Sequence, residues 1–211
     1  MTKTSRIMLA VSVCFVLLGV NAGEAAQGGE HMVVTGRTTQ PIGHYEYCKT
    51  YGADCSLRSS KTAPVKLTNE RLQEIAAIND HVNQSVTPVT DLDLYNVEEL
   101  WTYPERYGDC EDYVLQKRQM LMQRGWPASS LLITVVRQRN GDGHAVLTVR
   151  TDRADYILDN LENRVLPWSQ TEYQFLKRQS AANSGDSLQS SFTHRCAARS
   201  LASSAGSPSS H

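Results

Sequence analysis

Three residues of types that perform nucleophilic catalysis stand in the order Cys110, His144 and Asp159. A cysteine attacks as its thiolate, and the start of a helix favours that anion through free N–H groups and the helix dipole. A histidine can then act as the base, and a carboxylate can orient it. We therefore predict thiol chemistry with Cys110 as the nucleophile, His144 as the base and Asp159 as its orienting partner.

The elements that must bring these residues together follow from the sequence around them. Residues 110–124 contain no Gly or Pro and consist mostly of strong helix formers, so they predict a helix that begins at Cys110. Gly125 and Pro127 follow where a helix normally ends. Apolar, β-branched runs then predict three strands at Leu131–Arg137, 144–151 and 156–161. Turns at 140–143 and 152–155 join these strands.

The second turn decides whether His144 and Asp159 meet. A two-residue turn at Asp152 and Arg153 would place Asp159 opposite Val146 on antiparallel strands. His144 is then the diagonal neighbour of Asp159 on the same face, within reach of a carboxylate that holds an imidazole ring. A register shift of one residue would instead turn Asp159 to the other face.

Each of the three residues also has an ordinary structural explanation. A cysteine at a helix start can simply be buried, a histidine at a strand start can lie on the surface, and an aspartate before Asn160 can belong to a turn. Their order, on a helix followed by two neighbouring strands, favours catalysis because it reproduces a nucleophile, a base and an orienting group on a papain-like core.

Three carboxylates crowd the first turn of the predicted catalytic helix, namely Asp109, Glu111 and Asp112. The helix dipole favours acidic residues there, which is a sufficient structural explanation. The same charges would raise the pKa of the Cys110 thiol and oppose its ionisation. Either the carboxylates point away from the sulfur, or a bound cation neutralises them.

Residues 1–25 have the pattern of a secretory signal peptide. Lys3 and Arg6 precede a mostly apolar run at 7–20, and small residues follow, so that cleavage is expected after Ala22 or Ala25. The apolar run is shorter than the roughly 20 residues that a membrane-spanning helix needs. We therefore expect a periplasmic or secreted protein without a membrane span once the signal is removed.

Export to an oxidising compartment favours disulfide formation among the remaining cysteines. Cys48 and Cys55 flank a short loop that contains Gly52, and we predict that they are bridged. Two free thiols are the alternative, because a zinc site lacks a second Cys or His pair at suitable spacing.

The rest of the chain divides into three parts. Residues 26–66 are rich in Gly, Thr and Pro and predict an irregular N-terminal segment. Residues 67–180 hold the regular elements, beginning with a helix that Thr68 caps and Pro88 ends. Residues 181–211, which include Cys196, are expected to form a disordered tail. The expected fold is α+β, with the catalytic helix packed on an antiparallel sheet.

Residues 91–107 predict a loop with a short helix. Trp101 and Tyr103 in this stretch are interpreted as core residues, with a place in the wall of the cleft as the alternative, and Trp168 is interpreted as a further core residue. The chain of 211 residues has a net charge of −1 and no basic patch, which argues against nucleic acid as a partner.

Four stretches of sequence carry a likeness to a known family: YGDCEDYVLQKRQMLMQRGWP, GDGHAVLTVRT, DYILDN and VLPWSQTEYQFLKRQS. Together they resemble the bacterial transglutaminase-like cysteine proteinases, which include the LapG-type periplasmic proteases that clip large adhesins from the cell surface. The likeness covers residues 67–180 and implies a transglutaminase-type core. In that family the Cys of GDCEDY, the His of GHAVL and the Asp of LDN form the catalytic triad, and they correspond to Cys110, His144 and Asp159.

The resemblance also implies a metal. In LapG-type members the acidic residues around the nucleophile bind calcium, and Asp109, Glu111 and Asp112 stand at the matching positions. Hard carboxylate oxygens suit Ca²⁺, and a bound cation would offset the effect of these charges on the thiol. No organic cofactor is implied.

We therefore expect a cysteine peptidase that hydrolyses an amide bond in a periplasmic or surface protein through a thioester intermediate. Two alternatives stay open: a transglutaminase or amidase that uses the same triad, and an inactive relative that binds polypeptides. The sequence names neither the target protein nor the oligomeric state.

Overall fold

The computed structural model describes residues 31–190; the predicted signal peptide, Cys196 and the end of the predicted tail lie outside these residues. Its centre is a seven-stranded sheet in the order β1-β9-β8-β4-β5-β6-β7, in which every neighbouring pair is antiparallel. The strands are β1 (Val34–Thr38), β4 (Leu131–Arg137), β5 (Gly143–Arg150), β6 (Asp155–Leu158), β7 (Leu166–Pro167), β8 (Gln174–Gln179) and β9 (Ser187–Ser190). A separate parallel pair consists of β2 (Thr87–Pro88) and β3 (Tyr107–Gly108).

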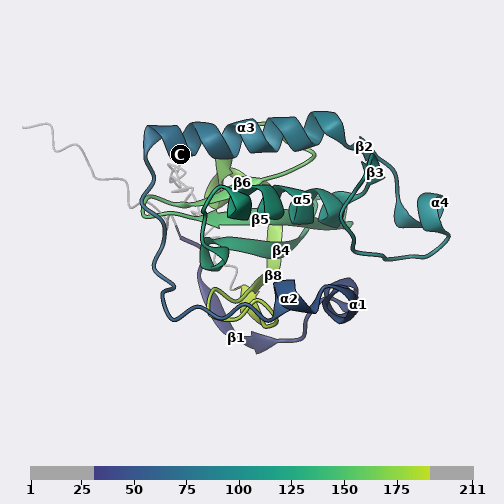
Figure 1. Cartoon of the computed structure of the whole chain (residues 1–211), viewed down its shortest axis with the longest axis horizontal. Helices are drawn as coiled ribbons and strands as arrows, with labels where there is room; N and C mark the ends of the chain where they lie inside the picture. Colours follow the sequence, from purple (N-terminus) through teal and green to yellow (C-terminus); the bar gives the residue numbers. More distant parts are fainter. Residues whose placement is uncertain (1–30, 191–211) are drawn as a thin grey trace, which may run out of the picture.

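The α-helices are α1 (Ile42–Thr50), α2 (Gly52–Cys55), α3 (Asn69–Ser85), α4 (Asp91–Tyr95) and α5 (Cys110–Gln123). Short 3-10 turns follow at Ala128–Ser130 and Trp168–Gln170. Figure 1 shows α5 between α3 and the sheet, while α1 and α2 lie at the opposite side from α3. The predicted α+β fold, with a helix packed on an antiparallel sheet, is confirmed. Within residues 31–190, no helix has the length and apolar character needed to cross a membrane.

Alternate residues of the central strands serve two cores. Ala145, Leu147 and Val149 of β5 belong to the main core, together with apolar residues of α3 and α5. Val146 belongs to a smaller cluster on the other face, where Trp168 packs against Phe175 with ring centroids 5.5 Å apart. Trp168 is only partly buried, so it packs against this smaller cluster and is not one of its buried members.

The predicted ends of both long helices are confirmed. The side chain of Thr68 accepts a hydrogen bond from the Arg71 N–H and caps α3. Gly125 follows α5 with a φ of +85°, a conformation that a residue with a Cβ rarely adopts, and its N–H bonds the Met122 carbonyl. The N–H of Trp126 returns to the Leu121 carbonyl and completes this C-terminal cap.

The two ends of the described chain differ from the sequence expectation. Within 26–66, which predicted an irregular segment, the structure has β1, α1 and α2. Within 181–211, which predicted disorder, β9 pairs with β1 on one side and β8 on the other. The pairing of β1 with β9 joins residues more than 140 positions apart, so no local pattern in either segment reveals it.

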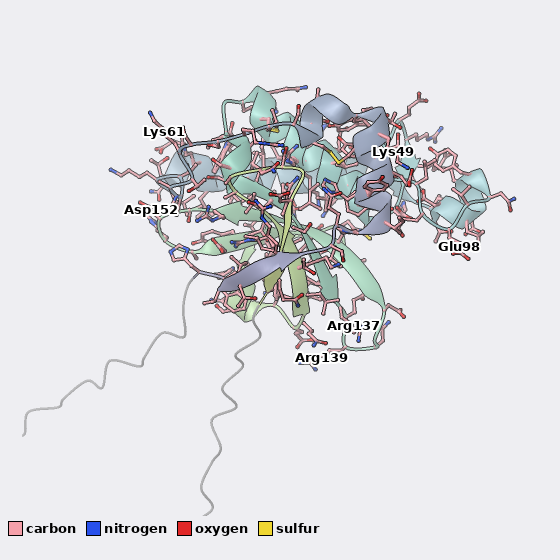
Figure 2. All side chains as sticks on the ribbon, turned by 90° about the horizontal axis from the view of Figure 1, so that it is seen from below. Lys49, Lys61, Glu98, Arg137, Arg139 and Asp152 are labelled. Atoms are coloured by element: carbon pink, nitrogen blue, oxygen red, sulfur yellow. A yellow bond between two sulfur atoms is a disulfide. The ribbon has the colours of Figure 1, made fainter. Side chains whose placement is uncertain are left out.

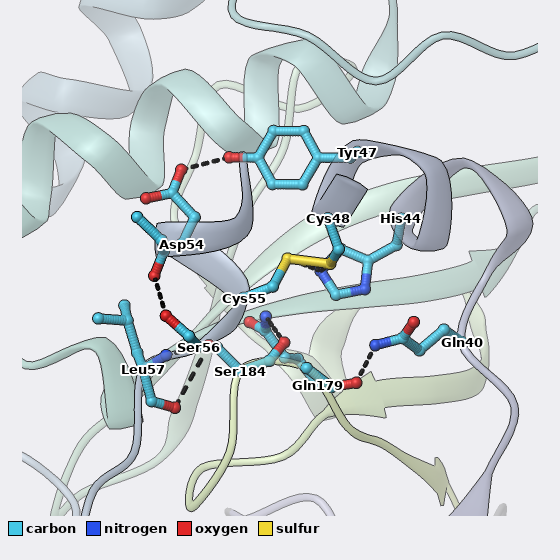
Figure 3. The surroundings of a disulfide bond; sticks show 12 residues. Gln40, His44, Tyr47, Cys48, Asp54, Cys55, Ser56, Leu57, Gln179 and Ser184 are labelled. Carbon is cyan, nitrogen blue, oxygen red and sulfur yellow. Dashed lines mark hydrogen bonds between the residues drawn. A yellow bond between two sulfur atoms is a disulfide. The ribbon is translucent and has the colours of Figure 1, made fainter. Parts of the chain in front are cut away.

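The predicted disulfide between Cys48 and Cys55 is present and joins α1 to α2. Figure 3 shows His44 beside it, with Nε2 at 3.8 and 3.9 Å from the two sulfur atoms. We call α1, α2 and this bridge the disulfide unit. Within it, the Tyr47 hydroxyl donates a hydrogen bond to the Asp54 carboxylate at 2.5 Å. The disulfide loop is thus packed into the main core, which explains why α1 forms although its sequence has no helical apolar period.

Lys117 is a fully buried cation in the middle of α5. Its side chain has no exposed surface, and its ammonium group has no hydrogen-bond partner within residues 31–190. The ammonium lies 5.7 Å from the centre of the Tyr113 ring. Burial lowers the pKa of Lys117 to about 7, against the opposing charges of Asp159 and Asp80. The fold therefore accommodates this side chain best in its neutral form.

We expect Lys117→Met to stabilise the protein by an amount that depends on pH. The native state takes up the Lys117 proton near pH 7, whereas the unfolded chain takes it up near pH 10.4. The wild-type free energy of unfolding therefore falls as the pH decreases towards 7, and methionine removes this term. The advantage of the variant should grow by about 1.4 kcal/mol per pH unit from pH 9 to 7 and level off below. Urea unfolding from pH 6 to 9 measures it, and an advantage independent of pH would contradict the assignment.

Candidate active site

Cys110 begins α5 directly after β3. Gly108 is needed at this point because a Cβ there would lie 2.6 Å from a carboxylate oxygen of Asp112. Asp109 is the N-cap residue, with extended backbone and no side-chain capping bond, so its carboxylate is available for other contacts. Cys110 is half-buried and is the one free cysteine within residues 31–190.

His144 and Asp159 meet as the strand register predicted. Leu147 of β5 pairs with Leu158 of β6, which places Asp159 opposite Val146, with His144 as its diagonal neighbour. The Nε2 atom of His144 lies 2.8 Å from Oδ1 of Asp159, and both side chains are buried. β6 ends one residue before Asp159 and not at 161, because Oδ1 of Asp159 also accepts the Leu161 N–H and turns the chain.

Tyr173 is a member of the site that the sequence did not reveal. Its hydroxyl donates to Oδ2 of Asp159 at 2.5 Å, and its ring lies 5.5 Å from the His144 ring. Burial acts to raise the pKa of Asp159. The hydrogen bond and charge of His144 act in the opposite direction, as do the hydrogen bonds from Tyr173 and the Leu161 N–H. Together they outweigh burial and lower the pKa of Asp159. Asp159 is therefore held as a carboxylate against His144.

The start of α5 lies against the strand that carries His144. The backbone N–H of Ala145, the residue after His144, acts to lower the pKa of the Cys110 thiol. Because Asp159 occupies Nε2 of the His144 ring, Nδ1 is the nitrogen left for another partner. The structure thus joins His144 to Asp159 and sets the helix that begins at Cys110 against the strand that carries His144.

Neighbouring charge opposes ionisation of the sulfur. The Cys110 thiol donates to Oε2 of Glu111 at 3.2 Å. Burial and the Glu111 carboxylate raise the pKa of Cys110, and the Ala145 N–H counteracts them only in part. The conflict that the sequence predicted between the acidic residues and the thiolate is therefore present in the structure.

The acidic residues form a cluster that differs in membership from the predicted one. Oxygen atoms of Asp91, Asp109 and Glu111 all lie within 4.8 Å of one another. Asp91 was missed because it stands 18 residues before Asp109 and sits at the start of α4, where the dipole alone explains a carboxylate. Asp112 is not in this group of three, and its Oδ1 accepts the Thr102 N–H at 2.9 Å.

The cluster and the neighbouring Asp112 have carboxylate oxygens without partners. Oδ1 of Asp91, Oδ1 of Asp109 and Oδ2 of Asp112 are buried and have no hydrogen-bond donor within residues 31–190. Burial, with the nearby charge of Asp109, raises the pKa of Glu111 to about 9 and that of Asp112 to about 7. Buried carboxylates at this spacing repel one another unless a cation joins them, and an all-oxygen set fits a hard divalent ion such as Ca²⁺.

A strap formed by residues 99–103 links this cluster to the disulfide unit. The Leu100 N–H donates to Asp91, next to the Thr102 bond to Asp112. Trp101 is 4% exposed, which confirms its interpretation as a core residue, and Tyr103 is partly buried against the same core. The Tyr103 hydroxyl donates to Asp54 at 2.6 Å, the carboxylate that also binds Tyr47 in Figure 3.

Comparison with known proteins identifies the family. The family described as bacterial transglutaminase-like cysteine proteinase (BTLCP) matches residues 34–191. Among solved structures, calcium-bound LapG from Legionella pneumophila is 22% identical over 68% of this chain and 78% of that chain, with a TM-score of 0.47. Its EGTA-treated form is 22% identical over 68% and 76%, with a TM-score of 0.46. No curated protein matches significantly. Because the family match spans most of the chain, the protein belongs to the bacterial transglutaminase-like cysteine proteinases.

Proposed function

We propose that this cysteine peptidase cleaves an amide bond with Cys110 as the nucleophile, His144 as the base and Asp159 as the group that orients the imidazole. One observation carries the proposal: the 2.8 Å hydrogen bond between buried His144 and Asp159, where His144 lies on the strand against which α5 packs. A nucleophile, a base and a third group that fixes the base are the requirements of triad catalysis.

The reaction begins when Nδ1 of His144 takes the proton of the Cys110 thiol. The thiolate attacks the carbonyl carbon of the substrate, and the N–H groups at the start of α5 stabilise the oxyanion, because the first N–H groups of a helix have no partner within it. The imidazolium then gives its proton to the departing amine, and a thioester remains on Cys110. Water activated by His144 hydrolyses the thioester and regenerates the thiol.

Asp159 and Tyr173 have supporting roles in this sequence. Asp159 accepts from Nε2 of His144, which fixes the tautomer that presents an unprotonated Nδ1 to the thiol. Its charge then stabilises the imidazolium. Tyr173 holds the second carboxylate oxygen and so fixes the plane of the carboxylate.

We further propose that Asp91, Asp109 and Glu111 hold a calcium ion, with Asp112 beside them holding the 99–103 strap. The convergent oxygens and their missing donors support this. Calcium bound there supplies positive charge that offsets the carboxylates. Glu111 would turn from a group that opposes the thiolate into a ligand, and the pKa of Cys110 would fall.

The proposed substrate is a polypeptide in the periplasm or on the cell surface. The signal-peptide pattern of residues 1–25 supports export, and the disulfide between Cys48 and Cys55 fits an oxidising compartment. The steps above use only side chains, backbone N–H groups and water, so an organic cofactor has no part in them.

Proteomic comparison of wild type with Cys110→Ala tests the function. Both proteins are incubated with periplasmic and surface proteins of the producing cell and a tagged primary amine. We expect new protein N-termini with the wild type only, and no tag. Tag incorporation without chain cleavage would show transfer to amines, and identical results for the two proteins would indicate a polypeptide-binding relative.

A further inference from the structure

A cavity of about 520 Å³ lies beside the candidate active site, and both Asp159 and Tyr173 form part of its wall. The turn between β4 and β5, the loop between β6 and β7 and the segment before β8 supply the rest of the lining. Figure 2 shows Arg139, one of the lining residues, at the tip of the β4–β5 hairpin. The cavity therefore extends from the buried carboxylate of the triad to an exposed hairpin.

The walls of this cavity are charged but balanced. Arg139 from the hairpin pairs with Glu172 before β8 at 2.7 Å, and Arg164 pairs with Glu162 at 2.7 Å. Each lining guanidinium thus already has a carboxylate. A charged ligand group would lose water here and find its natural partner occupied, which disfavours its burial.

Apolar side chains share the lining with the uncharged polar side chains of Gln138, Asn140, Gln170 and Thr171. Ile157 is buried in the smaller core, while Leu166 of β7 is partly exposed. Leu161 is 59% exposed and stands directly after the turn that Asp159 makes. An aliphatic side chain placed against these three residues would bury apolar surface on both sides, which is favourable by about 25 cal/mol per Å².

The proposed reaction determines which part of a substrate would reach the cavity. The departing amine must receive its proton from His144, so the chain that follows the scissile bond passes this ring. Asp159 binds Nε2 of the His144 ring, and the centre of the Tyr173 ring lies 5.5 Å from the centre of the His144 ring. Asp159 and Tyr173 line the cavity, whereas Cys110 and His144 do not, so the cavity lies beyond the reacting groups on the side of the ring that the departing chain must pass.

We propose that this cavity is the subsite for the substrate residues that follow the scissile bond, and that it selects an uncharged side chain there. The assignment rests on the proposed peptidase function. It names a class of substrate sequence, since the walls offer apolar and uncharged polar contacts and no unpaired charge. It also gives the Arg139–Glu172 pair a role, which is to keep the subsite neutral.

Two matched variants test the subsite. Glu172→Gln leaves Arg139 without its carboxylate, and Arg139→Gln leaves Glu172 without its guanidinium. Wild type and variants digest a peptide library made from a whole proteome, and mass spectrometry identifies the residues on both sides of each cut. Lys49→Gln is the control, because it removes another exposed ion pair, Lys49–Glu46 at 2.8 Å, on α1.

We expect the wild type and Lys49→Gln to prefer uncharged residues in the first three positions after the cut. Glu172→Gln should enrich acidic residues there by about two- to five-fold, and Arg139→Gln should enrich basic residues to the same extent, as the strength of an exposed ion pair predicts. Preferences before the cut should be the same in all four proteins.

Cleavage with identical preferences after the cut in wild type and both variants would overturn the subsite and leave the peptidase function intact. Shifts confined to the positions before the cut would place the cavity on the other half of the substrate and would also overturn it. A wild type that cuts no peptide or protein, while its Cys110 still reacts with an alkylating agent, would overturn the proposed function itself and the subsite with it.

Discussion

Asp159→Asn should lower kcat by on the order of 10⁴-fold while the protein stays folded, because the corresponding change in a serine protease triad has this effect. Asparagine preserves the shape of the side chain, but it has no negative charge to stabilise the imidazolium. Its amide can also donate to Nε2, which favours the tautomer with the proton on Nδ1, and that tautomer cannot accept the thiol proton. Steady-state cleavage kinetics and circular dichroism measure the two parts of this expectation.

The control for this change is Asp186→Asn. Asp186 pairs with Arg37 at 3.2 Å, remote in the sheet order from His144, and its loss should leave kcat unchanged. Alkylation supplies a second readout: His144→Ala should slow the reaction of Cys110 with iodoacetamide at neutral pH, since the imidazolium partner of the thiolate is gone. Equal alkylation rates in the wild type and His144→Ala would refute the triad.

Removal of calcium should abolish activity, and its return should restore both activity and thermal stability. An ion that binds the native state alone raises the free energy of unfolding by about 2.7 kcal/mol at a concentration of 100 Kd. Asp91→Asn removes one charged ligand of the proposed set and should raise the calcium concentration needed for half-maximal activity by roughly tenfold or more. Titrations of activity and of Tm against free Ca²⁺ measure these effects.

Asp93→Asn is the matched control on the same short helix. Asp93 is exposed, and its carboxylate accepts from the Thr90 hydroxyl. Its loss should leave the calcium requirement unchanged. Full activity in excess chelator, with a Tm that does not respond to calcium, would contradict the metal proposal and leave the helix dipole as the reason for the acidic residues.

The sequence was most informative where neighbouring residues determine the geometry. Gly125 and Thr68 mark helix ends through local hydrogen bonds, and the turn at 152–155 sets the register that brings Asp159 to His144. Such features depend on a few consecutive residues. The helix start at Cys110 follows in the same way from the uninterrupted run of helix formers behind it.

Contacts between distant segments were not predictable in this way. Asp91 reaches the cluster because β2 pairs with β3 and brings α4 next to the start of α5. Tyr173, just before β8, reaches Asp159, just after β6, although β4 and β5 lie between these two strands in the sheet. Neither residue stands in a local pattern that indicates its partner, so the three-dimensional topology was needed to find both.

The position of β9 has a consequence for how this chain can be shortened. Ser187–Ser190 lies between β1 and β8, so the last described residues join the first described strand to the sheet. A truncated protein that ends at residue 180 would keep Cys110, His144 and Asp159 but would leave β8 with a row of unpaired N–H and C=O groups. Unpaired rows of this kind recruit strands from other molecules. Such a truncated protein would therefore self-associate, although none of its proposed catalytic residues had been removed.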